Sequence, residues 1–388
     1  MSDLLAITGA RIFDGADWHD EAALLIEFGF VSGVVGRDAI PAHAARTELD
    51  GGMIVPGFID LQVNGGGGVL FNNAPTLASI RTICRAHAQF GTTALLPTLI
   101  TDTVEVNKAA IAAGIAAYEQ RVPGFLGLHL EGPHLAQSRK GTHDPALIRP
   151  MDDADLARLV DAAAALPNLL CTIAVESTSP QQIAALSGAG AIVSLGHSDA
   201  SYDAAKAAFA AGASMATHLF NAMSQLGNRE PGLVGAVLDS PQVFAGLIAD
   251  GIHVHRAAIA AALRAKQGPG RIFLVTDAMS QTGTDITSFT LNGRTITRAD
   301  GALRLADGTL AGADLDMIDA VNFMIETIGL PPEEVFRMAA LYPAQAMGIA
   351  ETHGHLRPRA QASFVHLSDA RQVRSTWIGG ETVWKAGG

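Results

Sequence analysis

Eight short apolar segments between residues 56 and 348 constrain the fold of this chain more than any other feature. Each precedes an Ala-rich stretch, and several of these stretches repeat their apolar residues at helical spacing. The strand candidates are 58–63, 93–97, 125–130, 170–175, 192–195, 215–217, 243–248 and 272–275, and the clearest helix candidates are 76–90, 155–166, 200–211, 256–265 and 314–328. Near-continuously apolar strands suit a buried parallel sheet. We predict an α/β chain with a (β/α)₈ TIM barrel, and a doubly wound open sheet is the alternative.

The two ends of the chain differ from the middle in their sequence pattern. Residues 1–55 contain brief β-prone runs separated by Gly and Asp turns, and residues 349–388 return to short strands. We therefore expect both ends to form one small β-sandwich domain, with the barrel in residues 56–348. Residues 285–312 contain the turn pairs Asn292-Gly293 and Asp300-Gly301, which predict hairpins. We expect these hairpins to pack on or near the β-domain.

The composition excludes several classes of function. Lys and Arg number 26 against 38 Asp and Glu, so the net charge of −12 disfavours binding to nucleic acid or to an anionic membrane. Cys84 and Cys171 are too few for a disulfide framework. The N-terminus does not resemble a signal peptide, and we find no uninterrupted apolar span of membrane length. These features predict a cytoplasmic enzyme.

Polar residues collect where the predicted strands end. Chemistry in a barrel takes place at the C-terminal ends of its strands. The groups found there are Asp60, Gln62 and Asn64; His129, Glu131 and His134; His197; His218; Asp250, His253 and His255; and Asp277. Six such groups on successive strands predict an active site at that face of the barrel.

Glu131, His197 and His218 form a plausible ligand set for one divalent metal ion. They offer one carboxylate oxygen and two imidazole nitrogens, which leaves one position of a tetrahedral Zn²⁺ for water. Gln62 and Asn64 stand where many barrel hydrolases carry two histidines, and neutral amides are weak ligands. We predict one metal per chain, Zn²⁺, with Fe²⁺ or another divalent ion as alternatives. Loop hydrogen bonding is the other interpretation of Gln62 and Asn64.

Two further residues have side chains suited to acid–base and electrophilic roles. Asp277 closes the eighth strand and can take a proton from an activated water and pass it to a leaving group. The alternative for Asp277 is a helix N-cap. His143 lies in the loop after the third strand and can reach a substrate carbonyl, and the alternative is a surface histidine. The chain lacks a G-x-S-x-G element, so a serine hydrolase is disfavoured.

Seven segments carry a family resemblance, in this order along the chain: PGFIDLQVNGGGG, GLHLEGPH with KGTH, SLGHSDA, ATHLFNAM, NREPGLVGA, DGIHV and VTDAM. They resemble the amidohydrolase superfamily, and within it the deacetylases of N-acetylglucosamine 6-phosphate. The resemblance implies a hydrolase of linear amide C–N bonds in amino-sugar catabolism, a part of carbohydrate metabolism, that releases acetate and glucosamine 6-phosphate. The alternatives are the N-acetylgalactosamine-6-phosphate deacetylases, an amidohydrolase of cyclic amides, and a metal-free scaffold.

The resemblance also implies roles for single residues. His143 polarises the acetamide carbonyl together with the metal. His253, the backbone at Asn221 and Ala222, and Arg229 hold the sugar phosphate. In the family the counterpart of Arg229 comes from the neighbouring subunit, which implies a homodimer.

Two positions depart from the family pattern. His134 follows the Glu-Gly-Pro turn where an aromatic or aliphatic residue is expected, and this predicts a slightly altered pocket wall. Ser363 stands where the superfamily often has Asp, in the predicted β-domain and away from the chemistry.

Overall fold

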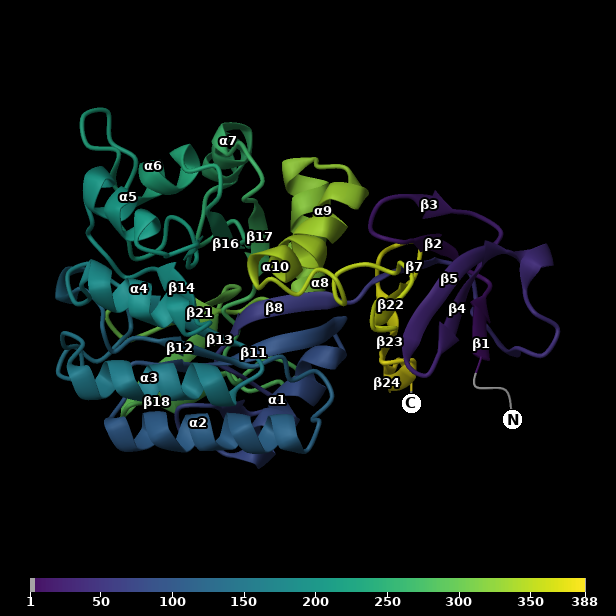
Figure 1. Cartoon of the computed structure of the whole chain (residues 1–388), viewed down its shortest axis with the longest axis horizontal. Helices are drawn as coiled ribbons and strands as arrows, with labels where there is room; N and C mark the ends of the chain where they lie inside the picture. The colour runs from purple at the N-terminus through teal and green to yellow at the C-terminus, as the bar shows by residue number, and fades with distance from the viewer. Residues whose placement is uncertain (1–3, 388) are drawn as a thin grey trace.

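Eight parallel strands form the central sheet of the larger part of the molecule (Figure 1). The computed structural model describes residues 4–387. Within it the strands lie side by side in chain order: β8 (Phe58–Val63), β11 (Thr92–Ile100), β12 (Leu128–Glu131), β13 (Leu169–Ile173), β14 (Ile192–Leu195), β15 (Met215–Ala216), β16 (Phe244–Ile248) and β17 (Ile272–Val275). All eight coincide with predicted strands.

The first and last strands meet and close the sheet into a barrel. A parallel bridge joins Val63 to Ala278, and the Asp277 N–H donates to the Gln62 carbonyl at 3.0 Å. The (β/α)₈ barrel is thus confirmed over the open-sheet alternative. Closure places the residues after β17 beside those of β8, and this contact builds one wall of the site.

Helices surround the barrel, and each of the predicted ones is present. They are α1 (Leu77–Ala88), α2 (Val104–Glu119), α3 (Asp153–Ala165), α4 (Pro180–Gly188), α5 (Tyr202–Ala210), α6 (Gly232–Asp239), α7 (Arg256–Ala265), α8 (Met317–Phe323) with the π-helical turn η3 (Met324–Ile328), α9 (Pro332–Ala339) and α10 (Leu341–Ala346). Side-chain caps begin several of them: Thr76 accepts from the Ser79 N–H, and Ser179 forms a capping box with Gln182.

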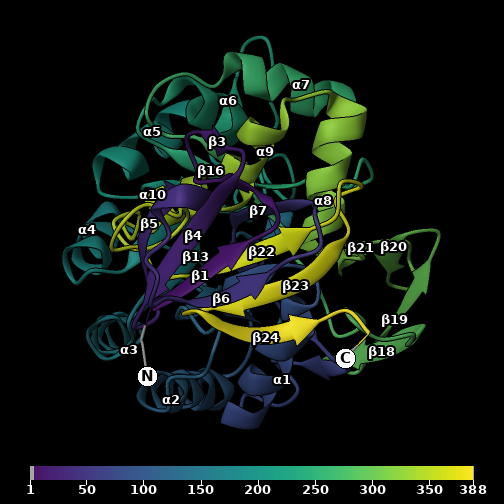
Figure 2. The same cartoon turned by 90° about the vertical axis from the view of Figure 1, so that its right-hand side faces the viewer.

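The two chain ends form a β-sandwich beside the barrel, as predicted (Figure 2). One sheet has the order β5-β4-β1-β6 and the other β24-β23-β22-β7-β2-β3. The strands are β1 (Leu4–Thr8), β2 (Arg11–Phe13), β3 (Trp18–His19), β4 (Ala22–Glu27), β5 (Phe30–Gly36), β6 (Ala45–Glu48), β7 (Met53–Pro56), β22 (Phe364–Leu367), β23 (Val373–Ile378) and β24 (Glu381–Lys385). β7 pairs antiparallel with β22, and a separate apolar cluster that includes Leu24, Ile54 and Phe364 fills the sandwich. The boundaries at residues 55 and 349 stay predictions.

The hairpin segment 285–312 lies against the barrel, so the expectation that it packs on or near the β-domain was wrong. It forms the sheet β18 (Ser288–Leu291), β19 (Arg294–Ala299), β20 (Ala302–Arg304) and β21 (Leu310–Ala313) (Figure 1). The apolar face of this sheet packs on residues of the loops that follow the barrel strands, among them Leu70 and Met279. The Arg294 guanidinium also donates to the Thr142 carbonyl, which ties the sheet to the loop that carries His143.

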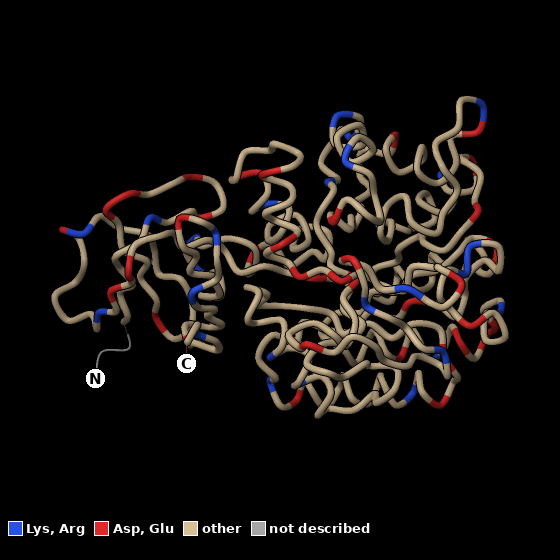
Figure 3. Tube along the Cα trace, turned by 180° about the vertical axis from the view of Figure 1, so that it is seen from behind, with Lys and Arg blue, Asp and Glu red and all other residues tan. Residues whose placement is uncertain are grey.

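The surface and the cysteines agree with the compositional analysis. Figure 3 shows basic and acidic residues interspersed over both parts of the chain. Cys84 and Cys171 are buried and free of disulfide bonds. Residues 4–387 contain no helix that is both long and apolar enough to cross a membrane.

Candidate active site

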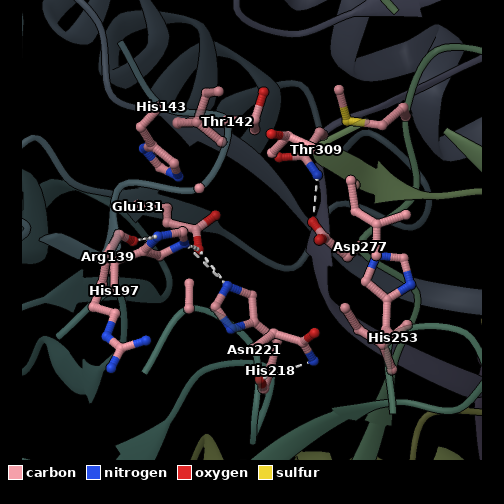
Figure 4. Close-up of a pocket in the computed structure, with 18 of the residues that line it drawn as sticks. Glu131, Arg139, Thr142, His143, His197, His218, Asn221, His253, Asp277 and Thr309 are labelled. Atoms are coloured by element: carbon pink, nitrogen blue, oxygen red, sulfur yellow. Dashed lines mark hydrogen bonds and ion pairs between the residues drawn. The ribbon is translucent and has the colours of Figure 1, made fainter. Parts of the chain in front are cut away.

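A cavity of about 350 Å³ opens where the barrel strands end (Figure 4). It brings together most of the predicted site residues: Asn64, Glu131, His143, His197, His218, Asn221, Ala222, His253 and Asp277. Glu131 is the last residue of β12, and His197, His218 and Asp277 each follow a strand by two residues. The active site predicted from the strand-end pattern therefore has a physical cavity at the predicted face.

Three atoms on one side of the cavity converge on a single point, and we call these residues the triad side: Glu131, His197 and His218 (Figure 4). Glu131 Oε1, His197 Nε2 and His218 Nε2 lie 3.1 Å from one another in all three pairs. Ligands about 2.0–2.1 Å from a tetrahedral ion lie about 3.3 Å apart, so this triangle fits one divalent metal. The donor set also fits, because imidazole and carboxylate are the ligands that catalytic zinc takes.

Glu131, His143 and His197 also come close enough together to hold an ion. We favour His218 as the third ligand because its Nε2 is equidistant from the other two ligand atoms. The three residues of the triad side are 2–5% exposed, so little water can reach their ligand atoms and compete for them.

Electrostatics on the triad side favour an ionised carboxylate. Burial opposes the charge of Glu131, but His197 and His218 hold its pKa well below the ordinary range. Burial likewise works against a charged His218, but the Glu131 carboxylate raises the pKa of His218 above its ordinary value. In each case the partner across the triangle outweighs burial, and a cation bound between them would likewise favour the ionised form of Glu131.

Across the cavity from the triad side, N–H donors meet a carboxylate, and we call these residues the amide side: Asn64 and Asp277, which line the cavity, and Gln62, which bonds to both Asp277 and Glu131. Gln62 Nε2 lies 3.2 Å from Asp277 Oδ1 and 3.3 Å from Glu131 Oε2, and it donates to both carboxylates. Asn64 Nδ2 donates to Asp277 Oδ1 at 2.7 Å. The two amides bond to the acidic side chains of the site, and their role as a replacement for a second metal stays a prediction.

Asp277 is held in an unusual backbone conformation on the amide side. Its φ is +53°, and His197 and His218 also have positive φ, which is uncommon for residues other than glycine and concentrates at functional sites. Burial and then the charge of Glu131 raise the pKa of Asp277 to about 6. Such a group can accept a proton and release it again near neutral pH. Within residues 4–387 the next element is the strand β18, so the N-cap alternative was wrong.

His143 is buried inside the cavity, which contradicts the alternative of a surface histidine. Its ring centroid lies 4.3 Å from that of His197. Burial, followed by the charge of His197, lowers the pKa of His143 well below its ordinary value. These effects favour the neutral form of the His143 imidazole, which lies beside the triad side.

His253 and the segment Asn221–Ala222 also line the cavity, with His253 beside Asp277 and Asn221 beside His218 in Figure 4. His253 Nδ1 lies 2.6 Å from Asp250 Oδ2, and both side chains are nearly buried. Sequence reasoning placed Asp250 at a strand end without a role. The Asp-x-x-His spacing was the available signal, because the Asp250 carboxylate also accepts from the N–H groups of the turn that carries His253.

Arg229 is the one predicted substrate-binding residue that its own chain does not bring to the cavity. It is exposed on the segment 225–230 between α5 and α6, which projects from the barrel in Figure 1, and Figure 3 shows charged residues at its tip. Leu226 in the same segment is 59% exposed.

The two departures from the family pattern lie outside the cavity. His134 is buried, its Nδ1 is 3.1 Å from the Arg149 carbonyl oxygen, and it does not line the cavity, so the expectation of an altered pocket wall was wrong. Ser363 Oγ accepts from the Gly379 N–H within the β-sandwich.

Sequence reasoning missed several contributors to the cavity and its rim, among them Thr101, Arg139 and Thr309. Arg139 and Thr309 line the cavity, and Thr101 bonds to His143. Arg139 follows the strand that ends at Glu131 and pairs with Asp199, two residues after His197. No local pattern marks Thr101 or Arg139, because their partners His143 and Asp199 are distant in sequence.

Comparison with known proteins places this geometry in context. A profile of the Amidohydrolase family matches residues 53–383. The chain is 40% identical to the N-acetylgalactosamine-6-phosphate deacetylase of Shewanella sp. (strain ANA-3), covering 99% of this chain and 97% of that protein. It is 34% identical to the N-acetylglucosamine-6-phosphate deacetylase of Haemophilus influenzae, with 98% and 99% covered. The crystal structure of N-acetylglucosamine-6-phosphate deacetylase from Pasteurella multocida superposes with a TM-score of 0.93 at 35% identity, with 98% and 99% covered.

Proposed function

The chain belongs to the amidohydrolase family, and we propose that it removes acetate from N-acetyl-D-glucosamine 6-phosphate to give glucosamine 6-phosphate. The observation that carries this proposal is the placement of Asp277 across the cavity from the triangle of Glu131, His197 and His218. The names of the relatives support an N-acetylhexosamine 6-phosphate as the substrate class. The galactosamine epimer is the second candidate, because the Shewanella relative that is 40% identical is named for it.

Hydrolysis of an amide needs an activated water, an electrophile at the carbonyl and a proton for the departing nitrogen. When bound by Glu131, His197 and His218, a divalent ion, for which we propose one Zn²⁺ per chain, supplies Lewis acidity that favours ionisation of water and polarises a carbonyl. Asp277 accepts the proton of the attacking water and later donates it to the amine nitrogen. Its pKa, raised to about 6, suits both transfers.

The amide side prepares Asp277 for this exchange. The Asn64 and Gln62 side chains both donate to Asp277 Oδ1. These bonds fix one carboxylate oxygen and leave Asp277 Oδ2 as the oxygen that takes the proton. Gln62 also holds Glu131 and Asp277 at a set separation, although their charges repel.

His143, His253 and the backbone at Asn221–Ala222 orient the substrate. His143 donates a hydrogen bond to the acetamide oxygen as negative charge develops on it, and loss of one such donor typically lowers the rate by about 10²–10³. His253 and the backbone at Asn221–Ala222 hold the phosphate, which lies remote from the reacting bond and supplies binding energy for orientation.

We further propose a homodimer in which Arg229 reaches the neighbouring site, because Arg229 is exposed and does not line the cavity of its own chain. A guanidinium can grip a phosphate with two hydrogen bonds. Arg229→Ala should raise KM and reduce the preference for the phosphorylated sugar, with metal content unchanged. Mixing Arg229→Ala with Asp277→Asn subunits should restore activity, since each hybrid holds one complete site. Verified hybrids without recovery would contradict the exchange.

Acetate release is the direct test of the proposed reaction. The assay compares N-acetylglucosamine 6-phosphate, its galactosamine epimer and unphosphorylated N-acetylglucosamine as substrates. We expect release from the first, weaker release from the second and little from the third. Faster turnover of the epimer would favour the second candidate, and no release from either phosphate would refute the proposal. The cytoplasm stays our prediction for where the reaction takes place.

A further inference from the structure

Two neighbouring histidines of the cavity receive backbone partners of opposite polarity. The His197 Nδ1 lies 2.8 Å from the Arg139 carbonyl oxygen. The His143 Nδ1 lies 3.3 Å from the Thr101 backbone N–H donor and 2.7 Å from Thr101 Oγ1. The rings of the two histidines are in contact, so they share one environment but differ in what their Nδ1 atoms face.

When each ring carries a single proton, the backbone partner decides which nitrogen holds it. A carbonyl only accepts, so His197 carries its proton on Nδ1 and leaves the Nε2 lone pair for the triad side. A backbone N–H only donates, so the His143 Nδ1 must offer its lone pair, and the proton lies on Nε2. Thr101 Oγ1 then also donates to Nδ1, which gives this nitrogen two donors from one residue.

We propose that Thr101 is a positioning residue that fixes His143 as an N–H donor at Nε2 and thereby excludes it from metal ligation. This inference rests on the proposed deacetylation, in which His143 must donate to the acetamide oxygen. A metal ligand needs a lone pair, so His143 in this tautomer cannot replace His218 even though it lies close to Glu131 and His197. The two histidines therefore differ in chemistry because their Nδ1 atoms face different partners, Arg139 for His197 and Thr101 for His143.

The surroundings of Thr101 hold it rigidly. It directly follows β11, whose last residue Ile100 pairs with Glu131 on β12, and it is 1% exposed. A Cβ on Gly132 would lie 2.3 Å from Thr101 Oγ1, so a residue without a side chain is required there to make room for the hydroxyl. The donor pair is thus attached to the end of β11, directly beside the end of β12 that presents Glu131.

Substitution of the hydroxyl separates this role from a packing role. Thr101→Val keeps the shape and removes the donor at 2.7 Å, but the weaker backbone N–H remains. We expect kcat to fall about tenfold with KM changed less than about twofold, and Thr101→Ser to recover most of kcat. Thr92→Val is a matched control on β11, the strand that Thr101 follows, because the Thr92 hydroxyl is buried and has no hydrogen-bond partner among the described residues. We expect this variant to leave kcat unchanged.

Nitrogen-15 NMR of histidine-labelled, zinc-loaded enzyme tests the tautomer without reference to turnover. The His143 signals are identified by their loss in His143→Gln. We expect a protonated Nε2 and a bare Nδ1 in the wild type, and mixed tautomers in Thr101→Val. A protonated Nδ1 on His143 in the wild type would overturn the inference even if the enzyme is active. A protonated Nε2 in an enzyme that releases no acetate would instead refute the proposed function alone. If Thr101→Val does not fold, the wild-type spectrum still decides.

Discussion

The two sides of the cavity carry similar numbers of polar side chains but offer a substrate opposite chemistry. The triad side presents lone pairs that converge within 3.1 Å of one another, and the amide side presents N–H groups that already donate to carboxylates. A cation stabilises the first arrangement and is repelled by the donors of the second. From this difference we propose that the placement of hydrogens, as well as residue type, favours one metal ion over two at this site.

The largest effect should follow loss of a ligand on the triad side. His197→Ala removes one of three converging atoms, so we expect loss of bound metal and of activity together. Elemental analysis and acetate release measure both in the same preparation. His253→Ala is the matched control, because it lines the same cavity but should keep its metal. A His197→Ala enzyme with full metal content would contradict the triad.

A somewhat smaller effect should follow on the amide side. Asp277→Asn preserves shape but cannot accept a proton, so kcat should fall by about 10²–10⁴ with metal retained. If the variant keeps more than about a tenth of the wild-type kcat, which is under about 1.4 kcal/mol of barrier, Asp277 is not the proton carrier. Comparison with His197→Ala then separates metal binding from proton transfer.

Much of the barrel and the triad could be predicted because their signals are local. The run 272–275 is apolar throughout, as burial on both faces of the sheet requires, and the run 58–63 is fully buried with Asp60 and Gln62 as its polar residues. The hairpin segment 285–312 was recognised as hairpins and misplaced, because alternation shows which face is buried but not what covers it. In contrast, α6 is buried along nearly its whole length and has no amphipathic pattern to mark it.

The contacts that set the chemistry could not be read from the sequence for a different reason. Gln62 meets Asp277 across the closure of the barrel, and Thr101 meets His143 from a neighbouring strand. Neither pair has a fixed spacing. Both contacts depend on closure of the sheet, which brings their partners together. The positions of the protons at Asp277 and His143 depend on these contacts and so could not be predicted from the sequence.

The pKa of Asp277 predicts a pH-dependent stability difference in metal-free protein. Its pKa is raised from 3.8 to about 6, so the folded state binds the proton more tightly than the unfolded state. The contribution of Asp277 to the free energy of unfolding is fully present below pH 4 and is lost as the pH rises through 6. The side chain at this position does not titrate in Asp277→Asn. The free energy of unfolding of this variant should therefore exceed that of the wild type by up to about 3 kcal/mol at pH 7, with little difference at pH 4. Urea unfolding at both pH values measures this, and a gain independent of pH would contradict it.

The smallest effect should follow conversion of the amide side toward the triad side. Gln62→His combined with Asn64→His replaces two donors with side chains that can offer lone pairs beside Asp277 and Glu131. We expect a second, weaker ion to bind when metal is in excess. Isothermal titration of the metal-free variant with Zn²⁺ measures the stoichiometry, and the double change to alanine is its control. Unchanged stoichiometry in the histidine variant would show that the donors alone do not exclude the ion.

Anomalous diffraction at the zinc edge, from crystals grown with excess Zn²⁺, tests the central claim most directly. The account predicts one peak per site, bound by Glu131, His197 and His218, with His143 at hydrogen-bonding distance from the substrate position and unligated. A second strong peak between Asp277 and the amides of Gln62 and Asn64, or a single ion ligated by His143, would contradict it.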